Sequence, residues 1–205
     1  MLKPKIVNNV VFDLGGVLFN LSEQATLDAF EKNGVKNVNE KYKKMIESEW
    51  FRDFEIGTIP PEEFRNHMRK LMEIDLSDEV FDSCWNAMIT SYPPINRAFL
   101  RRIAEKNNLY VLSNTNVIHV KYFEPIANWP SYLFKKRYYS NEIHFRKPDL
   151  ECFNFVVNDA KITPEDTVLL DDRIDNIENA KKAGWNAIHV KEQSALYRIF
   201  NYDTK

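Results

Sequence analysis

Four short apolar runs recur along the chain, at residues 7–12, 109–112, 167–170 and 187–190. Each is largely apolar and rich in branched aliphatic residues, which is typical of a strand buried on both faces of a parallel sheet. Between the runs, apolar residues recur at helical spacing, and Gly184 ends the helical pattern before the last run. Strands that alternate with helices predict an α/β fold with a doubly wound parallel sheet.

Residues 21–92 interrupt this alternation, because their apolar positions repeat only at helical spacing. Phe64 and Met68, for example, lie one helical turn apart. We therefore predict a core domain formed by residues 1–20 and 93–205, with a small α-helical cap inserted at residues 21–92, after the first strand.

The composition is that of a folded protein rather than a disordered one. Of the 205 residues, 44% are hydrophobic and 28% are charged, and a chain of this length can bury a sizeable core. The formal net charge of −2 argues against a nucleic-acid partner, which a large positive excess would attract. We expect a monomer or a weak homodimer.

The sequence shows neither a membrane segment nor a cysteine-based site. No apolar run approaches the ~18–20 residues of a membrane-spanning helix, and the first residues lack the apolar region of a secretory signal. We therefore expect no membrane partner and a cytoplasmic protein. The two cysteines, Cys84 and Cys152, form no Cys-x-x-Cys pair, which argues against zinc and for two reduced, buried thiols.

Acidic residues stand where two of the predicted strands end. Asp13 follows the first run, and Asp171 and Asp172 follow the third. In an open α/β sheet the carboxyl ends of the strands hold the ligand, and carboxylates crowded there repel one another unless a cation lies between them. Oxygen ligands from one or two carboxylates are typical of Mg²⁺. Asp also begins ordinary turns, so Asp13 taken alone has that second interpretation.

Two further segments have the chemistry of a phosphate site. Ser113 and Asn114 end the second run and precede a helix start, where a hydroxyl and free backbone N–H groups suit an anion. A plain helix cap is the alternative. Lys147, followed by Pro148, is a candidate point charge for phosphate, or else a surface lysine. We expect the basic cluster at residues 135–137 to be a solvated loop.

The chain order of these residues, Asp, then Ser, then Lys, then Asp-Asp, resembles that of the haloacid dehalogenase-like hydrolase superfamily. The motifs that carry the resemblance lie at residues 10–18, 111–116, 146–149 and 169–184, and residues 54–64 resemble the signature of its subfamily I, with a helical cap. The resemblance is greatest to the α-D-glucose-1-phosphate phosphatase branch. It implies a Rossmann-like core and a Mg²⁺-dependent phosphatase for small phosphorylated metabolites such as sugar phosphates.

Carried over motif by motif, the resemblance also implies the roles of individual residues. Asp13 would attack phosphorus and form an aspartyl phosphate. Ser113 and the backbone of Asn114 would bind phosphate oxygens, and Lys147 would neutralise charge on the nucleophile and on the phosphoryl group. Such roles fit phosphoryl transfer, in which positioning and charge neutralisation provide most of the catalysis.

The implied Mg²⁺ site uses the ends of the first and third strands. Asp13, the backbone carbonyl of Gly15 and an acid of the fourth motif would be its ligands. We favour Asp172 as the direct ligand and Asp171 as the residue behind it.

Gly15 is a departure from the family pattern, because the family's general acid/base would stand at this position. Such a group typically contributes about 10²–10⁴ in rate. His119 and His144 are possible substitutes, although each has the simpler interpretation of a core or surface imidazole. Because this acid is missing, a non-catalytic protein that binds a phosphorylated ligand or acts as a scaffold is an alternative.

A metal-free haloacid dehalogenase is a further alternative, against which the pair Asp171 and Asp172 argues because it calls for a metal. The sequence does not identify the substrate. Four residues of the cap segment are candidates to face the substrate, or else to form the core of the cap. They are Trp50, Phe51, Arg52 and Phe54.

Overall fold

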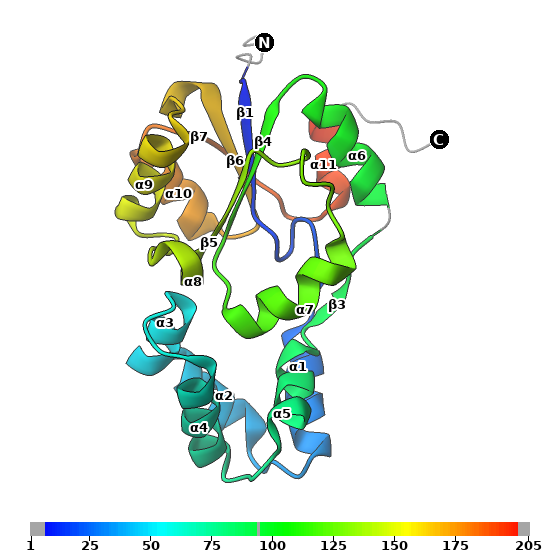
Figure 1. The fold of residues 1–205 in the computed structure, drawn as a ribbon, viewed down its shortest axis with the longest axis vertical. Helices are drawn as coiled ribbons and strands as arrows, with labels where there is room; N and C mark the ends of the chain where they lie inside the picture. The colour runs from blue at the N-terminus through cyan, green and yellow to red at the C-terminus, as the bar shows by residue number, and fades with distance from the viewer. Residues whose placement is uncertain (1–6, 94, 201–205) are drawn as a thin grey trace.

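A parallel sheet forms the centre of the molecule in the computed structural model, which describes residues 7–93 and 95–200 (Figure 1). Among these residues, five parallel strands run in the order β5-β4-β1-β6-β7. The strands are β1 (Asn9–Phe12), β4 (Asn108–Ser113), β5 (Lys136–Tyr139), β6 (Thr167–Asp171) and β7 (Asn186–His189). The predicted α/β class with a doubly wound sheet is confirmed.

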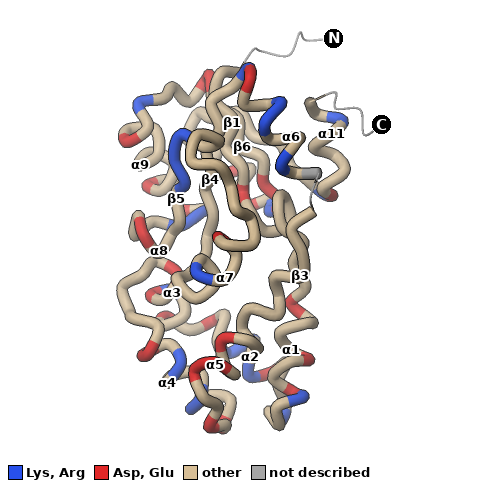
Figure 2. The backbone as a smooth tube through the Cα atoms, turned by 45° about the vertical axis from the view of Figure 1, so that its right-hand side comes forward, with Lys and Arg blue, Asp and Glu red and all other residues tan. Residues whose placement is uncertain are grey.

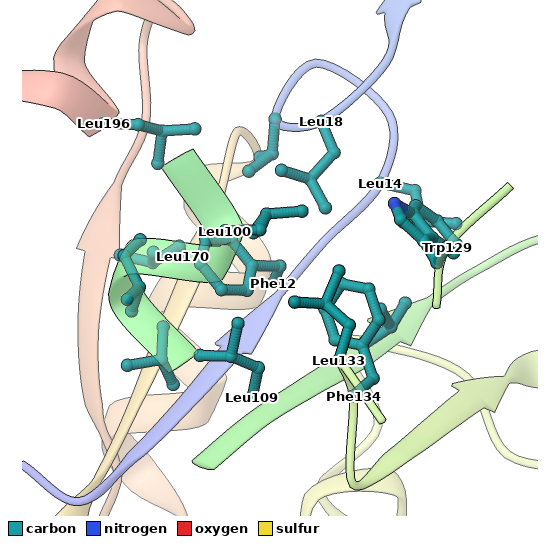
Figure 3. Close-up of a cluster of buried hydrophobic side chains, with 14 of the residues drawn as sticks. Phe12, Leu14, Leu18, Leu100, Leu109, Trp129, Leu133, Phe134, Leu170 and Leu196 are labelled. Atoms are coloured by element: carbon teal, nitrogen blue, oxygen red, sulfur yellow. The ribbon is translucent and has the colours of Figure 1, made fainter. Parts of the chain in front are cut away.

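Helices cover both faces of the sheet, and the two-residue period of the strands explains how. Val10 and Phe12 of β1 pack on one face with α6 (Ile95–Ala104), α7 (Val117–Ala127) and α11 (Ser194–Ile199). Val11 packs on the other face with α9 (Leu150–Ala160) and α10 (Ile174–Lys182). Figure 3 shows Phe12, Leu100 and Leu170 close together on the first of these two faces. Across the described residues, no helix has both the length and the apolar character needed to cross a membrane.

A separate group of helices, the helical layer, lies beyond the carboxyl end of the sheet (Figure 1). It consists of α1 (Glu23–Lys32), α2 (Val38–Ile46), α3 (Glu49–Glu55), α4 (Pro61–Met72) and α5 (Asp78–Asn86). Its apolar cluster is centred on the fully buried Phe64, which stacks on Phe54 with ring centroids 3.9 Å apart. Ile118 of α7 joins the same cluster and so connects this layer to the sheet domain.

Side-chain caps explain where several of these helices begin. Ser22, Ser48 and Ser77 each accept a hydrogen bond from the backbone N–H three residues on, at the starts of α1, α3 and α5. The predicted boundaries of core and cap stay a prediction. Residues 1–6, Pro94 and residues 201–205 of the expected core lie outside the described residues.

A short two-stranded sheet corrects the prediction that residues 21–92 are helical throughout. β2 (Asn20–Leu21) pairs antiparallel with β3 (Ile89–Ser91), where the chain leaves and re-enters the core. Strands of two and three residues are too short to show a period in the sequence. Their pairing joins segments about 70 positions apart, which no local pattern reports.

The prediction of a solvated loop at residues 135–137 is wrong for the last two of them, although Lys135 and Lys136 are exposed as expected. Lys136 and Arg137 begin β5, which shows as a basic segment in Figure 2. β5 is an edge strand, where basic side chains are common because they oppose further strand pairing. Lys136 pairs with Asp159 at 2.7 Å and Arg137 with Glu124 at 3.3 Å.

Candidate active site

The parallel pairing of β1, β4 and β6 brings the predicted site residues to one edge of the sheet. Asp13 directly follows β1, and its backbone N–H donates to the carbonyl of Leu170 at 2.9 Å. Ser113 is the last residue of β4 and Asp171 is the last residue of β6. Because β4 and β6 flank β1, the three strand ends are immediate neighbours.

Three carboxylates crowd together at this edge. Each of Asp13, Asp171 and Asp172 offers an oxygen within 4.8 Å of the others. Burial raises the pKa of Asp13 to about 7, Lys147 opposes that rise, and the charges of the two neighbouring carboxylates add to it. Burial and Asp171 also raise the pKa of Asp172. The cluster has the donor set of a hard divalent cation and is electrostatically unfavourable without one.

Lys147 is fully buried between two of these carboxylates, so the surface-lysine interpretation is wrong. Its Nζ lies 3.1 Å from Oδ1 of Asp13 and 2.5 Å from Oδ2 of Asp171. Burial alone would lower the pKa of Lys147, but the two carboxylates outweigh burial and raise it. The ammonium therefore stays charged beside Asp13.

Asp171 and Asp172 have different surroundings. Asp171 is fully buried and accepts hydrogen bonds from Lys147, from the backbone N–H of Arg173 at 2.9 Å and from Nδ2 of Asn176 at 2.9 and 3.1 Å. Its oxygens are thus engaged by protein donors. Asp172 is exposed and its carboxyl lies against Gly16, where a Cβ would collide with it. The Asp172 carboxyl therefore lies beside the turn that follows Asp13.

Neither Ser113 nor Asn114 caps α7. That helix begins at Val117, and Asn116 is its cap, so the plain-cap alternative for Ser113 is wrong. Nδ2 of Asn114 donates to the carbonyl of Lys147 at 2.7 Å, and the N–H of Lys147 donates back to Oδ1 at 2.8 Å. The Asn114 side chain therefore fixes the segment that carries Lys147.

A cavity with about 640 Å³ of empty space, partly open to solvent, extends from these strand ends toward the helical layer. Gly15, Ser113 and Asn114 line its inner end. Most of the remaining wall is apolar or aromatic. It includes Phe19, Leu21, Tyr42, Phe51, Trp85, Met88, Ile89 and Phe123. The site can thus hold an anion at the sheet edge and an attached group in the cavity.

Of the four cap candidates, Phe51 is the one that lines this cavity. Phe54 is part of the apolar cluster of the helical layer, and Trp50 stacks on His67 with ring centroids 5.0 Å apart. Arg52 pairs with Asp149 at 3.0 Å. The aromatic group as a whole therefore serves mainly the packing of the helical layer.

The two histidines considered as substitutes for the missing acid occupy different environments. His144 is exposed, and its Nδ1 lies 2.8 Å from the carbonyl oxygen of Ile56. His119 is buried and lines the cavity, and burial lowers its pKa to about 3. An imidazole with so low a pKa is neutral at pH 7 and is therefore not a general acid for the leaving group.

Sequence reasoning missed Asn176 and Ser140. Asn176 follows the strand-end Asp171 by five positions, a spacing that could have suggested a side chain folding back onto it. The Ser140 hydroxyl accepts from the N–H of Thr115 at 2.9 Å and donates to the carbonyl of Glu55 at 2.6 Å. Ser140 thus joins the β4 turn to α3, and no local pattern shows such a contact.

Comparison with known proteins gives a consistent result. Residues 7–184 match the model of a hydrolase family, haloacid dehalogenase-like hydrolase. A D-ribitol-5-phosphate phosphatase of Bacteroides thetaiotaomicron is 25% identical over 185 residues, 88% of this chain and 90% of that protein.

Solved structures give the same picture. The HAD family enzyme bt-2542 of Bacteroides thetaiotaomicron superposes with a TM-score of 0.89 and 33% identity, over 96% of this chain and 99% of that one. Its complex with magnesium and inorganic phosphate superposes with a TM-score of 0.83 and 34% identity, over 89% and 93% of the two chains.

Proposed function

The chain belongs to the haloacid dehalogenase-like hydrolases, and from its site we propose that it is a Mg²⁺-dependent phosphatase for small phosphorylated metabolites, with sugar and polyol phosphates as its substrates. The observation that carries the proposal is the buried Lys147 between Asp13 and Asp171 at the sheet edge. The similar phosphatase and the similar structure with magnesium and phosphate support it.

The carboxylate cluster fits a divalent cation. Asp13, Asp172 and the backbone carbonyl of Gly15 are the groups that would hold Mg²⁺, since the oxygens of Asp171 are already engaged by protein donors. Gly16, at φ 69°, lets Asp172 approach the Asp13 turn, because a side chain there would occupy the space of the carboxyl. Bound Mg²⁺ would neutralise charge on the phosphoryl group.

The side chains and backbone of the site supply the other parts of the proposed mechanism. The Asp13 carboxylate attacks phosphorus, the ester oxygen leaves, and an aspartyl phosphate forms that water then hydrolyses. Lys147 offsets the negative charge on Asp13 and on the phosphoryl oxygens, and its burial strengthens this interaction. Ser113 and the backbone of Asn114 bind the phosphate, while the Asn114 side chain positions Lys147.

Gly15 leads to a prediction about leaving groups. Without an acid at position 15, the departing oxygen takes its proton from water or from the phosphate, at a cost that grows with leaving-group basicity. An anomeric hydroxyl is more acidic than an ordinary sugar alcohol. We therefore expect a higher kcat/KM for hexose 1-phosphates than for 6-phosphates of the same sugar, measured by phosphate release. The reverse preference would contradict this leaving-group argument.

Gly15→Asp should help the poorer leaving group more than the better one. Gly15 does not have a left-handed φ, so a side chain there is limited by space rather than by backbone strain. Its Cβ would collide with the end of the Leu21 side chain, which is flexible and 44% exposed.

Removal of Asp172 tests the metal assignment. We expect Asp172→Ala to weaken Mg²⁺ binding at least about tenfold, because it removes a direct ligand. Isothermal titration calorimetry measures the affinity, with the exposed Asp75→Ala as the matched control. If Asp172→Ala bound Mg²⁺ as tightly as the wild type, Asp171 would be the direct ligand instead.

Magnesium affinity should also depend on pH. Burial holds the pKa of Asp13 near 7 without metal, so below that pH a proton occupies the carboxyl that Mg²⁺ needs. Affinity should therefore rise up to about tenfold per pH unit toward pH 7 and level off above it. Calorimetry between pH 5.5 and 8 should detect proton release on the acid side. Affinity independent of pH over this range would contradict the assignment of Asp13 as a ligand.

The proposed activity itself is tested by hydrolysis of p-nitrophenyl phosphate with Mg²⁺ and with EDTA, followed by a panel of phosphorylated sugars and polyols. We expect release of phosphate that depends on Mg²⁺. Phosphate binding without turnover would favour a non-catalytic binding protein. Release of halide from a 2-haloacid in EDTA would favour a dehalogenase.

A further inference from the structure

Most of the cavity wall is apolar or aromatic, and His119 is one of the polar side chains in it, together with Tyr42 and Glu55. His119 lines the cavity together with Trp85 and Phe51, beyond the residues that face the phosphate. A hydrogen-bonding atom in such surroundings has a large effect on which ligand binds, because an unmatched polar atom there loses its hydrogen bonds to water.

Packing fixes the plane of the His119 ring. It stacks on Trp85 of α5, with ring centroids 5.1 Å apart and only 4° between the planes. Its backbone N–H donates to Oδ1 of Asn116 at 3.1 Å, at the start of α7. The ring therefore has a defined position between the sheet domain and the helical layer.

A hydrogen bond fixes the proton on the ring. Nδ1 lies 2.9 Å from Oδ1 of Asn86, which is an acceptor, so Nδ1 carries the hydrogen and donates it. Burial keeps the imidazole neutral, with a pKa of about 3. Nε2 then has a lone pair, and the hydrogen bond that the ring makes within the described part of the chain is at Nδ1. Since Asn86 engages Nδ1, Nε2 is the ring nitrogen that remains for a ligand in the cavity that His119 lines.

We infer that His119 determines specificity, because its Nε2 accepts a hydrogen bond from a hydroxyl group on the alcohol part of the substrate. The inference rests on the proposed phosphatase function and narrows its substrate class. The substrate is a phosphate monoester whose alcohol has an apolar face for the Trp85 side of the cavity and a further hydroxyl for His119. A carboxylate at that point is disfavoured, because it brings lone pairs against a lone pair.

This role differs from that of the missing acid. A neutral imidazole that donates through Nδ1 to Asn86 has no proton at Nε2 to give. His119 therefore recognises a hydroxyl group, and the leaving-group argument for Gly15 is unchanged.

Two substitutions separate the two edges of the ring. His119→Asn places an amide near the Nδ1 position, so a donor to Asn86 is kept while the acceptor is lost. His119→Gln is longer and returns an amide oxygen near the Nε2 position. The two probes are ribitol 5-phosphate and n-pentyl phosphate, which are five-carbon primary esters with and without further hydroxyls.

In His119→Asn we expect kcat/KM for ribitol 5-phosphate to fall about tenfold relative to kcat/KM for n-pentyl phosphate, the size of one lost hydrogen bond. His119→Gln should restore most of this ratio. An unchanged ratio in His119→Asn would overturn the inference. So would an equal loss for both esters, because that would mean a structural role.

A second measurement needs no change at position 119. In full-length Asp13→Asn labelled with ¹⁵N-histidine, NMR should show an unprotonated Nε2 whose resonance shifts with ribitol 5-phosphate but not with n-pentyl phosphate. A protonated Nε2, or a resonance that ribitol 5-phosphate leaves unmoved, would overturn the inference about His119 but not the proposed phosphatase function. Failure of the wild type to hydrolyse any phosphate monoester would instead overturn the proposed function.

Discussion

Asp13→Asn should reduce turnover at least about a thousandfold, because an amide is a poor nucleophile and a weaker Mg²⁺ ligand. The fold should survive. Asn is nearly the same size, and burial, which raises the pKa of Asp13, disfavours the charge that the substitution removes. The measurement is kcat with p-nitrophenyl phosphate in saturating Mg²⁺, together with a thermal melt in EDTA.

Asp75→Asn is the matched control, since the same chemical change falls on an exposed residue. It should leave both kcat and the melting temperature near their wild-type values. An Asp13→Asn enzyme that keeps more than about a tenth of wild-type kcat would lose only ~1.4 kcal/mol of barrier lowering. That result would exclude Asp13 as the nucleophile.

Lys147→Met should damage both activity and stability. The substitution leaves the carboxylates of Asp13 and Asp171 buried without their counter-charge, which typically costs about 3–5 kcal/mol in the free energy of unfolding. Loss of a preorganised charge beside the phosphoryl group should lower kcat by about 10²–10³. Urea unfolding at pH 7.5 measures the first effect and steady-state kinetics the second.

The loss of stability should shrink at pH 5, because Asp13, whose pKa burial raises to about 7, is then protonated and needs no counter-charge. Lys135→Met, on an exposed residue just before β5, is the control and should change neither quantity appreciably. Wild-type stability in Lys147→Met at pH 7.5 would contradict the ion-pair network around Lys147.

Hydrophobic patterns in the sequence were sufficient for the main architecture, because buried parallel strands and amphipathic helices each impose a local period. β5 was missed for a physical reason. It is an edge strand whose first residues are basic and solvated, so it lacks the continuous apolar run of β1 or β6. The β2–β3 pair was missed because its strands are short and their contact is long-range.

The candidate site, too, could be predicted from the sequence only in part. Asp13, Ser113 and the pair Asp171 and Asp172 could be recognised because strand ends of a parallel sheet share one edge. Lys147 lies on a loop and is buried, and its sequence context alone suggested a surface residue.

The tautomer of His119 could not be predicted at all. It depends on Asn86, 33 positions away on another helix.

The most direct test of the central claim is to trap the phosphoenzyme. The wild-type enzyme is quenched in acid during turnover of p-nitrophenyl phosphate with Mg²⁺, and then reduced with borohydride, which converts an aspartyl phosphate to homoserine. Peptide mass spectrometry should find homoserine at position 13, and it should be absent when Mg²⁺ is replaced by EDTA. Steady turnover with an unmodified Asp13, or with the label on another residue, would contradict the account.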